Sequence, residues 1–198
     1  MLGVIFLFLG IIIFLFFFWK RLKEDYSSER IFSTAFYILF GIGAGFLAVW
    51  FFKYQQFWFW ASSLGFISGF LLGNYKFELQ FFESLEAASI GVLFLLGLIF
   101  LADSITFSNT FSLAGFGIIF LLIGFWFFLE SKYKNFSWYK SGRVGFSGLL
   151  VAGLFFLIRA GVATAFPTVL SFVGGVEGIV SGIVAFSFFL GLYNLSRV

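Results

Sequence analysis

Seven long apolar stretches occupy most of this chain and limit what it can fold into. An α-helix needs roughly 20 mainly apolar residues to cross a hydrocarbon core of about 30 Å. Only 11% of the residues are charged, against about 25% in soluble domains. We therefore expect an all-α integral membrane protein, with residues 1–198 in a single bundle of seven transmembrane helices. The expected spans are residues 2–19, 31–52, 57–73, 87–103, 107–129, 144–163 and 168–193.

The first stretch differs from a secretory signal peptide. No Lys or Arg precedes it, its apolar run is long, and no cleavage site of small residues follows it. Instead the basic sequence KRLK comes directly after it, at residues 20–23. We therefore expect this stretch to be kept as the first helix.

The basic residues are distributed unevenly between the two sides of such a bundle. Ten of the twelve Lys and Arg residues fall in the loops at 20–30, 74–86 and 130–143 and in the C-terminal tail. The opposite side holds only Lys53 and Arg159. Because cytoplasmic loops of membrane proteins are enriched in Lys and Arg, this pattern predicts an outside N-terminus and a cytoplasmic C-terminus.

The chain contains neither cysteine nor histidine, which narrows its chemistry. Disulfides, thiolate nucleophiles and thiolate metal sites are excluded, and the usual general base and metal ligand are missing. We therefore expect no metal site and no cofactor. The net charge is only +3 and no basic stripe is present, so nucleic acid is not an expected partner.

Two rows of glycines recur every four residues, a spacing that places each row on one face of a helix. Such faces let neighbouring membrane helices approach closely. The same faces could instead form a groove that admits a lipid or an ion between helices. Gly41 and Gly45 add a shorter row in the second span. The two rows are Gly65, Gly69 and Gly73, and Gly174, Gly178 and Gly182.

The third span carries a pattern of aromatic and small residues, WASSLGFISGFLLG, at residues 60–73. This pattern resembles the motif Trp-x-Gly-Gly-Leu-x-Phe-His-Gly-Gly-Leu-x-Gly of the prolipoprotein diacylglyceryl transferase family. The sequence WFFLE, which ends at Glu130, is similar to the family's Arg-Phe-x-x-Glu. The resemblance extends over about residues 10–158. The residues that fit these motifs are Trp60, Leu64, Phe66, Gly69 and Glu130.

The resemblance implies a multi-pass protein of the bacterial inner (plasma) membrane that acts in lipoprotein biosynthesis. Its partners would be membrane phospholipid, phosphatidylglycerol above all, and lipoprotein precursors whose cysteine receives the diacylglyceryl group. The departures are equally informative. Ile67 occupies the position of the family's histidine, and the matching arginines are absent. The resemblance therefore implies the scaffold, and it leaves open whether the diverged chain keeps the activity.

Three ionisable residues lie in the outer halves of the expected spans, where charge is costly and often functional. Asp103 ends the fourth span, Arg159 lies near the end of the sixth, and Glu177 lies about nine residues into the seventh. We expect Glu177 and Arg159 to face each other. In an enzyme, Arg159 and Lys53 would bind lipid phosphate, and Glu177 or Asp103 would be the catalytic group that handles the proton. The alternatives are a structural ion pair and a proton or ion path through Glu177.

Two further carboxylates, Glu83 and Glu86, lie about one helical turn apart at the expected cytoplasmic interface. We expect them to form a solvated helix face.

Three functions therefore remain open, and each predicts a different interior. A diverged transferase would have a laterally open cleft lined by Arg159 and Lys53. A non-enzymatic lipid-binding or assembly scaffold would be a closed bundle without a polar cavity. A small transporter or channel would depend on Glu177, although no repeat between the two halves of the chain supports it.

Overall fold

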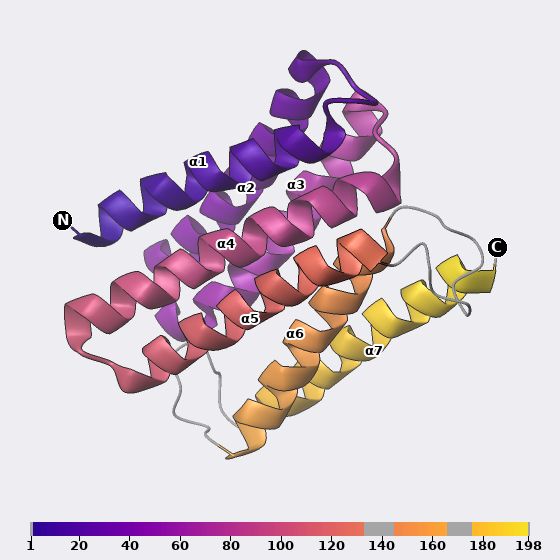
Figure 1. Ribbon diagram of the computed structural model, residues 1–198. Helices are drawn as coiled ribbons and strands as arrows, with labels where there is room; N and C mark the ends of the chain where they lie inside the picture. Colours follow the sequence, from indigo (N-terminus) through magenta and orange to yellow (C-terminus); the bar gives the residue numbers. More distant parts are fainter. Residues whose placement is uncertain (1, 133–144, 166–175, 198) are drawn as a thin grey trace.

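The computed structural model describes residues 2–132, 145–165 and 176–197, and Figure 1 shows them as a bundle of helices. Within these ranges the protein is all-helical and contains no strand, which confirms the all-α part of the expected fold class. The elements are α1 (Leu2–Leu22), α2 (Ser28–Phe51), the short 3-10 helix η1 (Gln55–Phe57), α3 (Trp58–Phe77), α4 (Phe81–Phe107), α5 (Thr110–Lys132), α6 (Phe146–Ala165) and α7 (Glu177–Arg197).

Six of the seven α-helices are long and apolar enough to cross a membrane, and α3 is the exception. Its small and polar residues, among them Ser62, Ser63 and Ser68, make it less apolar than its neighbours. Even so, α3 returns the chain from the end where α2 finishes to the end where α4 begins (Figure 1). At 1.5 Å per residue its length is about 30 Å. This arrangement of long apolar helices is typical of a multi-pass membrane protein.

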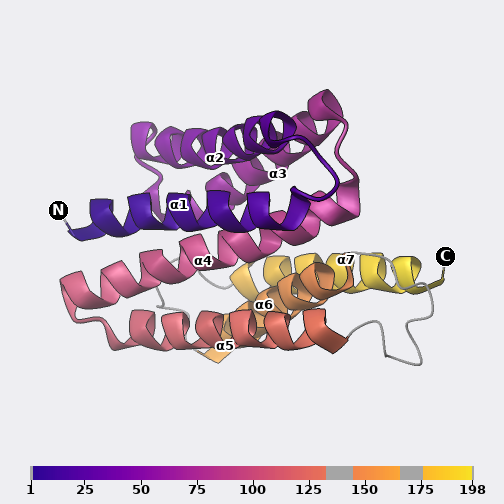
Figure 2. The same cartoon turned by 45° about the horizontal axis from the view of Figure 1, so that its top comes forward.

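The helices form three layers, which Figure 2 shows in side view. The hairpin of α2 and α3 forms one outer layer, α1 lies against α4 in the middle, and α5, α6 and α7 form the other outer layer. Among these helices, α3 makes its extensive backbone contacts with α2. This leaves room between α3 and the helices on its other side.

The hairpin of α2 and α3 depends on glycines in both helices. A Cβ atom added to Gly41 would lie well within 3.0 Å of the carbonyl group of Gly65, and one added to Gly65 would meet Gly41 in the same way. Gly45 and Gly69 lie equally close to backbone carbonyls of the partner helix, and Gly73 lies against Thr34. The row at 65, 69 and 73 is therefore a site of close helix packing.

The second glycine row has this role only in part. Gly182 has no atom within 4 Å of its Cβ position, so the prediction that it packs closely is wrong. A Cβ atom added to Gly178 would lie 3.3 Å from the side chain of Thr164, which is a tight contact, and 3.5 Å from the backbone oxygen of Ala160. Gly174 lies outside the described residues. The α6–α7 contact uses a different glycine, Gly153, against which the ring of Phe189 packs.

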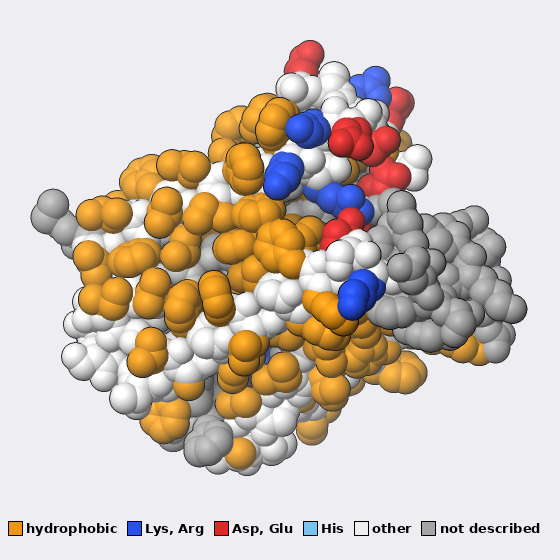
Figure 3. All heavy atoms as spheres, viewed as in Figure 1, with side chains coloured by type: hydrophobic (Ala, Val, Ile, Leu, Met, Phe, Trp, Pro, Cys, Tyr) orange, Lys and Arg blue, Asp and Glu red, His pale blue; other side chains and the backbone are white. Residues whose placement is uncertain are grey.

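Charged side chains gather at one end of the bundle, where α1 ends and α2 begins (Figure 3). We call this the basic end; its described Lys and Arg side chains are Lys20, Arg21, Lys23, Arg30, Lys76 and Lys132. The other end, where α7 begins, we call the Glu177 end. The flank between them exposes apolar side chains such as Ile5, Phe8 and Ile12. A patch of this kind is stable in contact with lipid and not with water.

Candidate functional site

Arg159 and Glu177 form an ion pair at the Glu177 end, as the sequence predicts. The Arg159 Nε–H donates a 2.8 Å hydrogen bond to Glu177 Oε1, and Nη2 lies 2.6 Å from the same oxygen. Arg159 is 6% exposed and Glu177 only 1%. Buried charges require such a partner, because desolvation costs each of them several kcal/mol. The pair joins α6 to α7.

The Glu177 carboxylate has further donors around it. The indole Nε1–H of Trp60 donates to Oε2 over 2.9 Å, and the hydroxyl of Ser181 donates to Oε1 over 3.2 Å. Glu177 is also the first residue of α7, where the positive end of the helix dipole favours a carboxylate. It was expected about nine residues into a span, and it lies instead at the start of its helix.

The Arg159 guanidinium is enclosed on its other side by aromatic rings. Its carbon lies 3.6 Å from the centroid of the Phe59 ring and 5.7 Å from that of Trp60. A desolvated cation gains about 2 kcal/mol from such a ring face. A lipid phosphate would therefore have to compete with Glu177 for this group. The arrangement is that of a structural ion pair.

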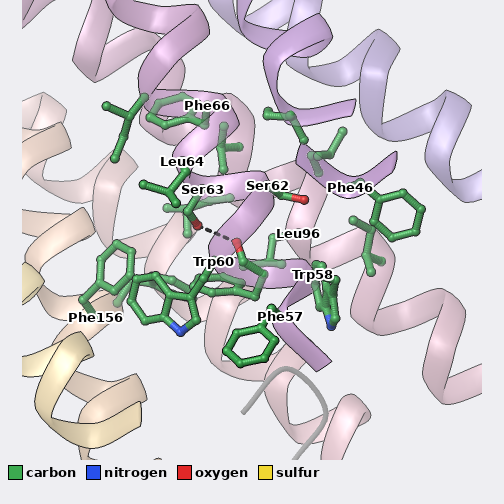
Figure 4. Close-up of a pocket in the computed structure, with 18 of the residues that line it drawn as sticks. Phe46, Phe57, Trp58, Trp60, Ser62, Ser63, Leu64, Phe66, Leu96 and Phe156 are labelled. Atoms are coloured by element: carbon green, nitrogen blue, oxygen red, sulfur yellow. Dashed lines mark hydrogen bonds between the residues drawn. The ribbon is translucent and has the colours of Figure 1, made fainter. Parts of the chain in front are cut away.

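A cavity of about 1280 Å³ lies beside this pair, between α3, α4, α6 and α7, with smaller contributions from α1 and α2. Figure 4 shows side chains of α2, α3, α4 and α6 around it, including Phe46, Trp60, Leu96 and Phe156. The wall is mainly apolar. The cavity exists because α3 packs closely on α2 and stands away from α4. The lining residues with polar groups in their side chains are Trp58, Trp60, Ser62, Ser63, Ser89, Asp103, Thr106 and Glu177.

Asp103 lies on the cavity wall near the end of α4. Its Oδ2 accepts hydrogen bonds from the hydroxyl of Ser112 and, over 3.3 Å, from Nδ2 of Asn109. The Asn109 side chain in turn accepts a bond from the backbone N–H of Phe111 in the first turn of α5. Asp103 and Glu177 therefore line the same cavity.

The two residues expected to bind phosphate are not among the lining residues. Arg159 is behind Glu177 and Phe59, and Lys53 is exposed in the turn between α2 and η1. Lys53 has a φ of 61°, in the left-handed region that side chains other than glycine rarely adopt. The cavity is therefore not the cleft lined by Arg159 and Lys53 that was predicted for a transferase, because its described wall carries carboxylates where cations were expected.

The residues that carry the family resemblance lie in three places. Trp60, Leu64 and Phe66 line the cavity. Gly69 lies in the close contact of α3 with α2. Glu130 lies at the basic end of the bundle, opposite the end that holds Asp103 and Glu177. There it accepts a 3.3 Å hydrogen bond from the hydroxyl of Ser147.

A second buried ion cluster lies at the basic end. Nη2 of Arg21 is 3.0 Å from Oε1 of both Glu86 and Glu130. The other Glu86 oxygen accepts the backbone N–H of Gly145. Glu86 is only 1% exposed, so the expectation of a solvated face is wrong for this residue. Gly148 explains how α6 comes so near, because a Cβ atom there would meet the Glu86 backbone at 2.7 Å.

Glu83 is hydrogen-bonded by Tyr26, which lies in the loop between α1 and α2. The Tyr26 hydroxyl donates a 3.0 Å hydrogen bond to Glu83 Oε2 and accepts one from the backbone N–H of Gln80. Partial burial of the Tyr26 phenol raises its pKa above the usual value, and the Glu83 carboxylate raises it further.

Sequence reasoning missed the roles of Trp60, Phe59 and Arg21. Trp60 was noted as a match to the family motif, and Arg21 lay in a basic loop. One available signal was the chemistry of the indole: inside a membrane its N–H requires an acceptor, and carboxylates are scarce in these spans. The partners of Arg21 are 65 residues or more away along the chain, so no local pattern indicates them.

Two further findings complete the description of the site. Among the described residues, no group of three acidic, His or Cys side chains is placed to hold a metal ion. Comparisons with protein-family models, curated proteins and solved structures find no match. Fold and site thus define a class, a multi-pass helical membrane protein with a mainly apolar cavity between its helices, and the function is inferred from the cavity.

Proposed function

We propose that this protein binds a membrane lipid and holds its acyl chains in the cavity between α3, α4, α6 and α7. The observation that carries this proposal is the cavity itself, about 1280 Å³ in volume and mainly apolar. Ligand pockets are usually concave, mostly apolar and equipped with a few polar groups that orient the ligand. The polar groups lie chiefly toward the Glu177 end, where a head group would reach water.

The size of the cavity suits a lipid with two chains. If a methylene group fills about the volume of a water molecule, ~30 Å³, two chains of ~16 carbons need on the order of 1000 Å³. The wall along α4 extends from Asp103 to Leu85. At 1.5 Å per residue, this distance is about 27 Å, comparable to the hydrocarbon core of a bilayer.

The proposal includes an orientation in the membrane. The described Lys and Arg side chains are concentrated at the basic end, which supports a cytoplasmic location for that end. The N-terminus would then lie outside, and the cavity's polar groups would lie at the outer leaflet. The proposed location is the plasma membrane, the inner membrane in a bacterium with two.

A second candidate is the transferase activity that the family resemblance implies, with phosphatidylglycerol and lipoprotein precursors as substrates. It is favoured by one observation: Trp60, Leu64 and Phe66, which carry the motif, line this cavity. However, no Lys or Arg is among the lining residues of the described chain, and a leaving phosphate needs cationic donors. Lipid binding is therefore the primary proposal. The ion pair and hydrogen bonds of Glu177 weigh against a proton path.

Lipid binding is tested by filling the cavity. Val180 of α7 lines the cavity, whereas its neighbour Ile179 does not and is 65% exposed. Val180→Trp should reduce the lipid that remains bound to the purified protein in native mass spectrometry, because the indole occupies the space of the chains. Ile179→Trp is the matched control and should retain it. Equal retention in both variants, or no retention by the wild type, would contradict the proposal.

The second candidate is tested in the same preparation. Purified protein in phosphatidylglycerol vesicles is incubated with a cysteine-containing lipobox peptide. Transfer would join the peptide sulfur to the glycerol carbon, release glycerol phosphate and pass the thiol proton to a base. Thioether-linked product that disappears in Asp103→Asn would establish the enzyme. Retained lipid without product would leave lipid binding as the function.

A further inference from the structure

We infer that the lipid held in this cavity carries a primary amine in its head group, as phosphatidylethanolamine does, and that Asp103 binds the ammonium. This inference rests on the proposed lipid binding and adds the chemical class of the head group. It follows from the charges on the cavity wall, from the hydrogen bonds of Asp103 and from its depth in the bundle.

The cavity wall carries negative and not positive side chains. Among the described lining residues, Asp103 and Glu177 are carboxylates and none is Lys or Arg. Glu177 is neutralised by Arg159, which lies 2.6 Å away. Asp103 is therefore the wall residue whose charge a ligand can complement.

Asp103 is bound only by neutral donors among the described residues. Ser112 and Asn109 both donate to Oδ2, while Oδ1 accepts no hydrogen bond and no described cation lies within salt-bridge distance. A carboxylate near hydrocarbon is costly unless a cation approaches it. An ammonium group supplies this charge, and its N–H bonds can reach the remaining oxygen.

The position of Asp103 along α4 suits a head group. It lies one turn before the helix ends at Phe107, at the Glu177 end of the bundle, and the apolar wall extends from there toward Leu85. Chains placed along this wall bring the head group to the level of Asp103. Thr106, also on the wall, lies one turn farther toward water.

Other head groups fit this wall less well. Phosphatidylglycerol has a net negative charge and no amine, so it would bring its phosphate toward a carboxylate without compensation. Diacylglycerol offers a hydroxyl donor but leaves the charge of Asp103 unpaired. Phosphatidylethanolamine is net neutral, and its amine can pair with Asp103 while its phosphate remains in water.

The test is a competition for the cavity. The full-length protein is placed in nanodiscs of phosphatidylethanolamine and phosphatidylglycerol in equal amounts, with a minor fraction of diacylglycerol, and extracted. The bound lipids are then quantified by mass spectrometry. We expect phosphatidylethanolamine to be enriched over its bilayer share by about fivefold, the ratio that ~1 kcal/mol gives for a part-buried ion pair.

Variants separate the role of Asp103 from general effects of charge. Asp103→Asn should bring the lipid ratio back to that of the bilayer while the total bound lipid remains, and Asp103→Glu should keep the enrichment. Glu78→Gln removes the same charge from an exposed residue at the basic end, and should change nothing. If Asp103→Asn fails to fold, the Asp103→Glu result and the wild-type lipid ratio still decide whether the amine inference holds.

The outcomes distinguish this inference from the proposed function. Bound lipid in the bilayer ratio, enrichment of phosphatidylglycerol or diacylglycerol, or enrichment that survives Asp103→Asn would each overturn the amine inference and leave lipid binding intact. A wild type that retains no lipid would overturn both.

Discussion

The indole N–H of Trp60 on α3 donates a 2.9 Å hydrogen bond to Oε2 of Glu177, the first residue of α7. The Trp60 ring also stacks on Phe156 of α6, with centroids 6.2 Å apart. These contacts connect the α2–α3 hairpin to the α6–α7 hairpin next to the cavity. The cavity therefore stays open between helices that are joined at the Glu177 end.

Trp60→Phe should lower the free energy of unfolding by about 1–3 kcal/mol, because the substitution removes a hydrogen-bond donor from a buried carboxylate. Denaturant titration in detergent micelles measures this change. Trp58→Phe is the matched control, since the Trp58 indole makes no hydrogen bond to a described residue. Equal effects of the two substitutions would show that only ring volume matters.

Arg159→Met should be more damaging, by about 3–5 kcal/mol, because it leaves Glu177 charged and buried without its cation. The double variant Arg159→Met, Glu177→Gln removes both charges. We expect it to be less destabilised than the sum of the two single variants, and the difference to appear in a double-mutant cycle. Strict additivity would mean that the two residues do not interact energetically.

Gly41→Ala should disrupt the α2–α3 hairpin, because its Cβ atom would collide with the backbone of Gly65. Overpacking typically costs about 1–3 kcal/mol, and backbone atoms yield less easily than side chains. Gly43→Ala, on the same helix with no atom within 4 Å, should be neutral or slightly stabilising. Thermal unfolding in micelles compares them; similar melting temperatures would contradict the close approach.

The sequence predicts well what depends on local pattern. Apolar run length predicts the helices, and the four-residue spacing predicts the glycine contact at Gly65 and Gly69. The pairing of Arg159 with Glu177 could be predicted because few charges lie in the outer halves of the spans, so each has few possible partners. This scarcity of charges is the reason that one long-range contact could be predicted from the sequence.

What depends on how helices pack could not be predicted. Glu86 was expected in solvent because it lies one helical turn from Glu83 at the expected cytoplasmic interface. Its burial results from Arg21 on α1 and from the approach of α6 at Gly148. The cavity is likewise a property of the space between α3 and α4. The small residues of α3 explain only its contact with α2.

Arg21→Met should destabilise the basic end strongly, because it leaves Glu86 and Glu130 facing each other without their shared cation. Glu130→Gln should cost only about 1 kcal/mol, since it converts a cluster of two carboxylates and one arginine into a one-to-one ion pair. Hydrogen exchange of the first turn of α4 and of α6 reports the difference. A larger effect of Glu130→Gln would contradict this assignment.

Tyr26 predicts a pH dependence at the basic end. Burial and the Glu83 carboxylate raise the pKa of its phenol above the ordinary value near 10. A group whose pKa is raised in the folded state contributes stability below its unfolded pKa and loses it as the pH rises through the folded pKa. The contribution of Tyr26 should therefore be constant below about pH 10 and decline above it.

The titration of this phenol is measured as the difference between the absorbance titration curves of the wild type and of Tyr26→Phe. Glu83→Gln should shift its titration toward lower pH, while Tyr75→Phe, at an exposed position, should leave it unchanged; an unshifted titration in Glu83→Gln would show that the carboxylate does not act on Tyr26.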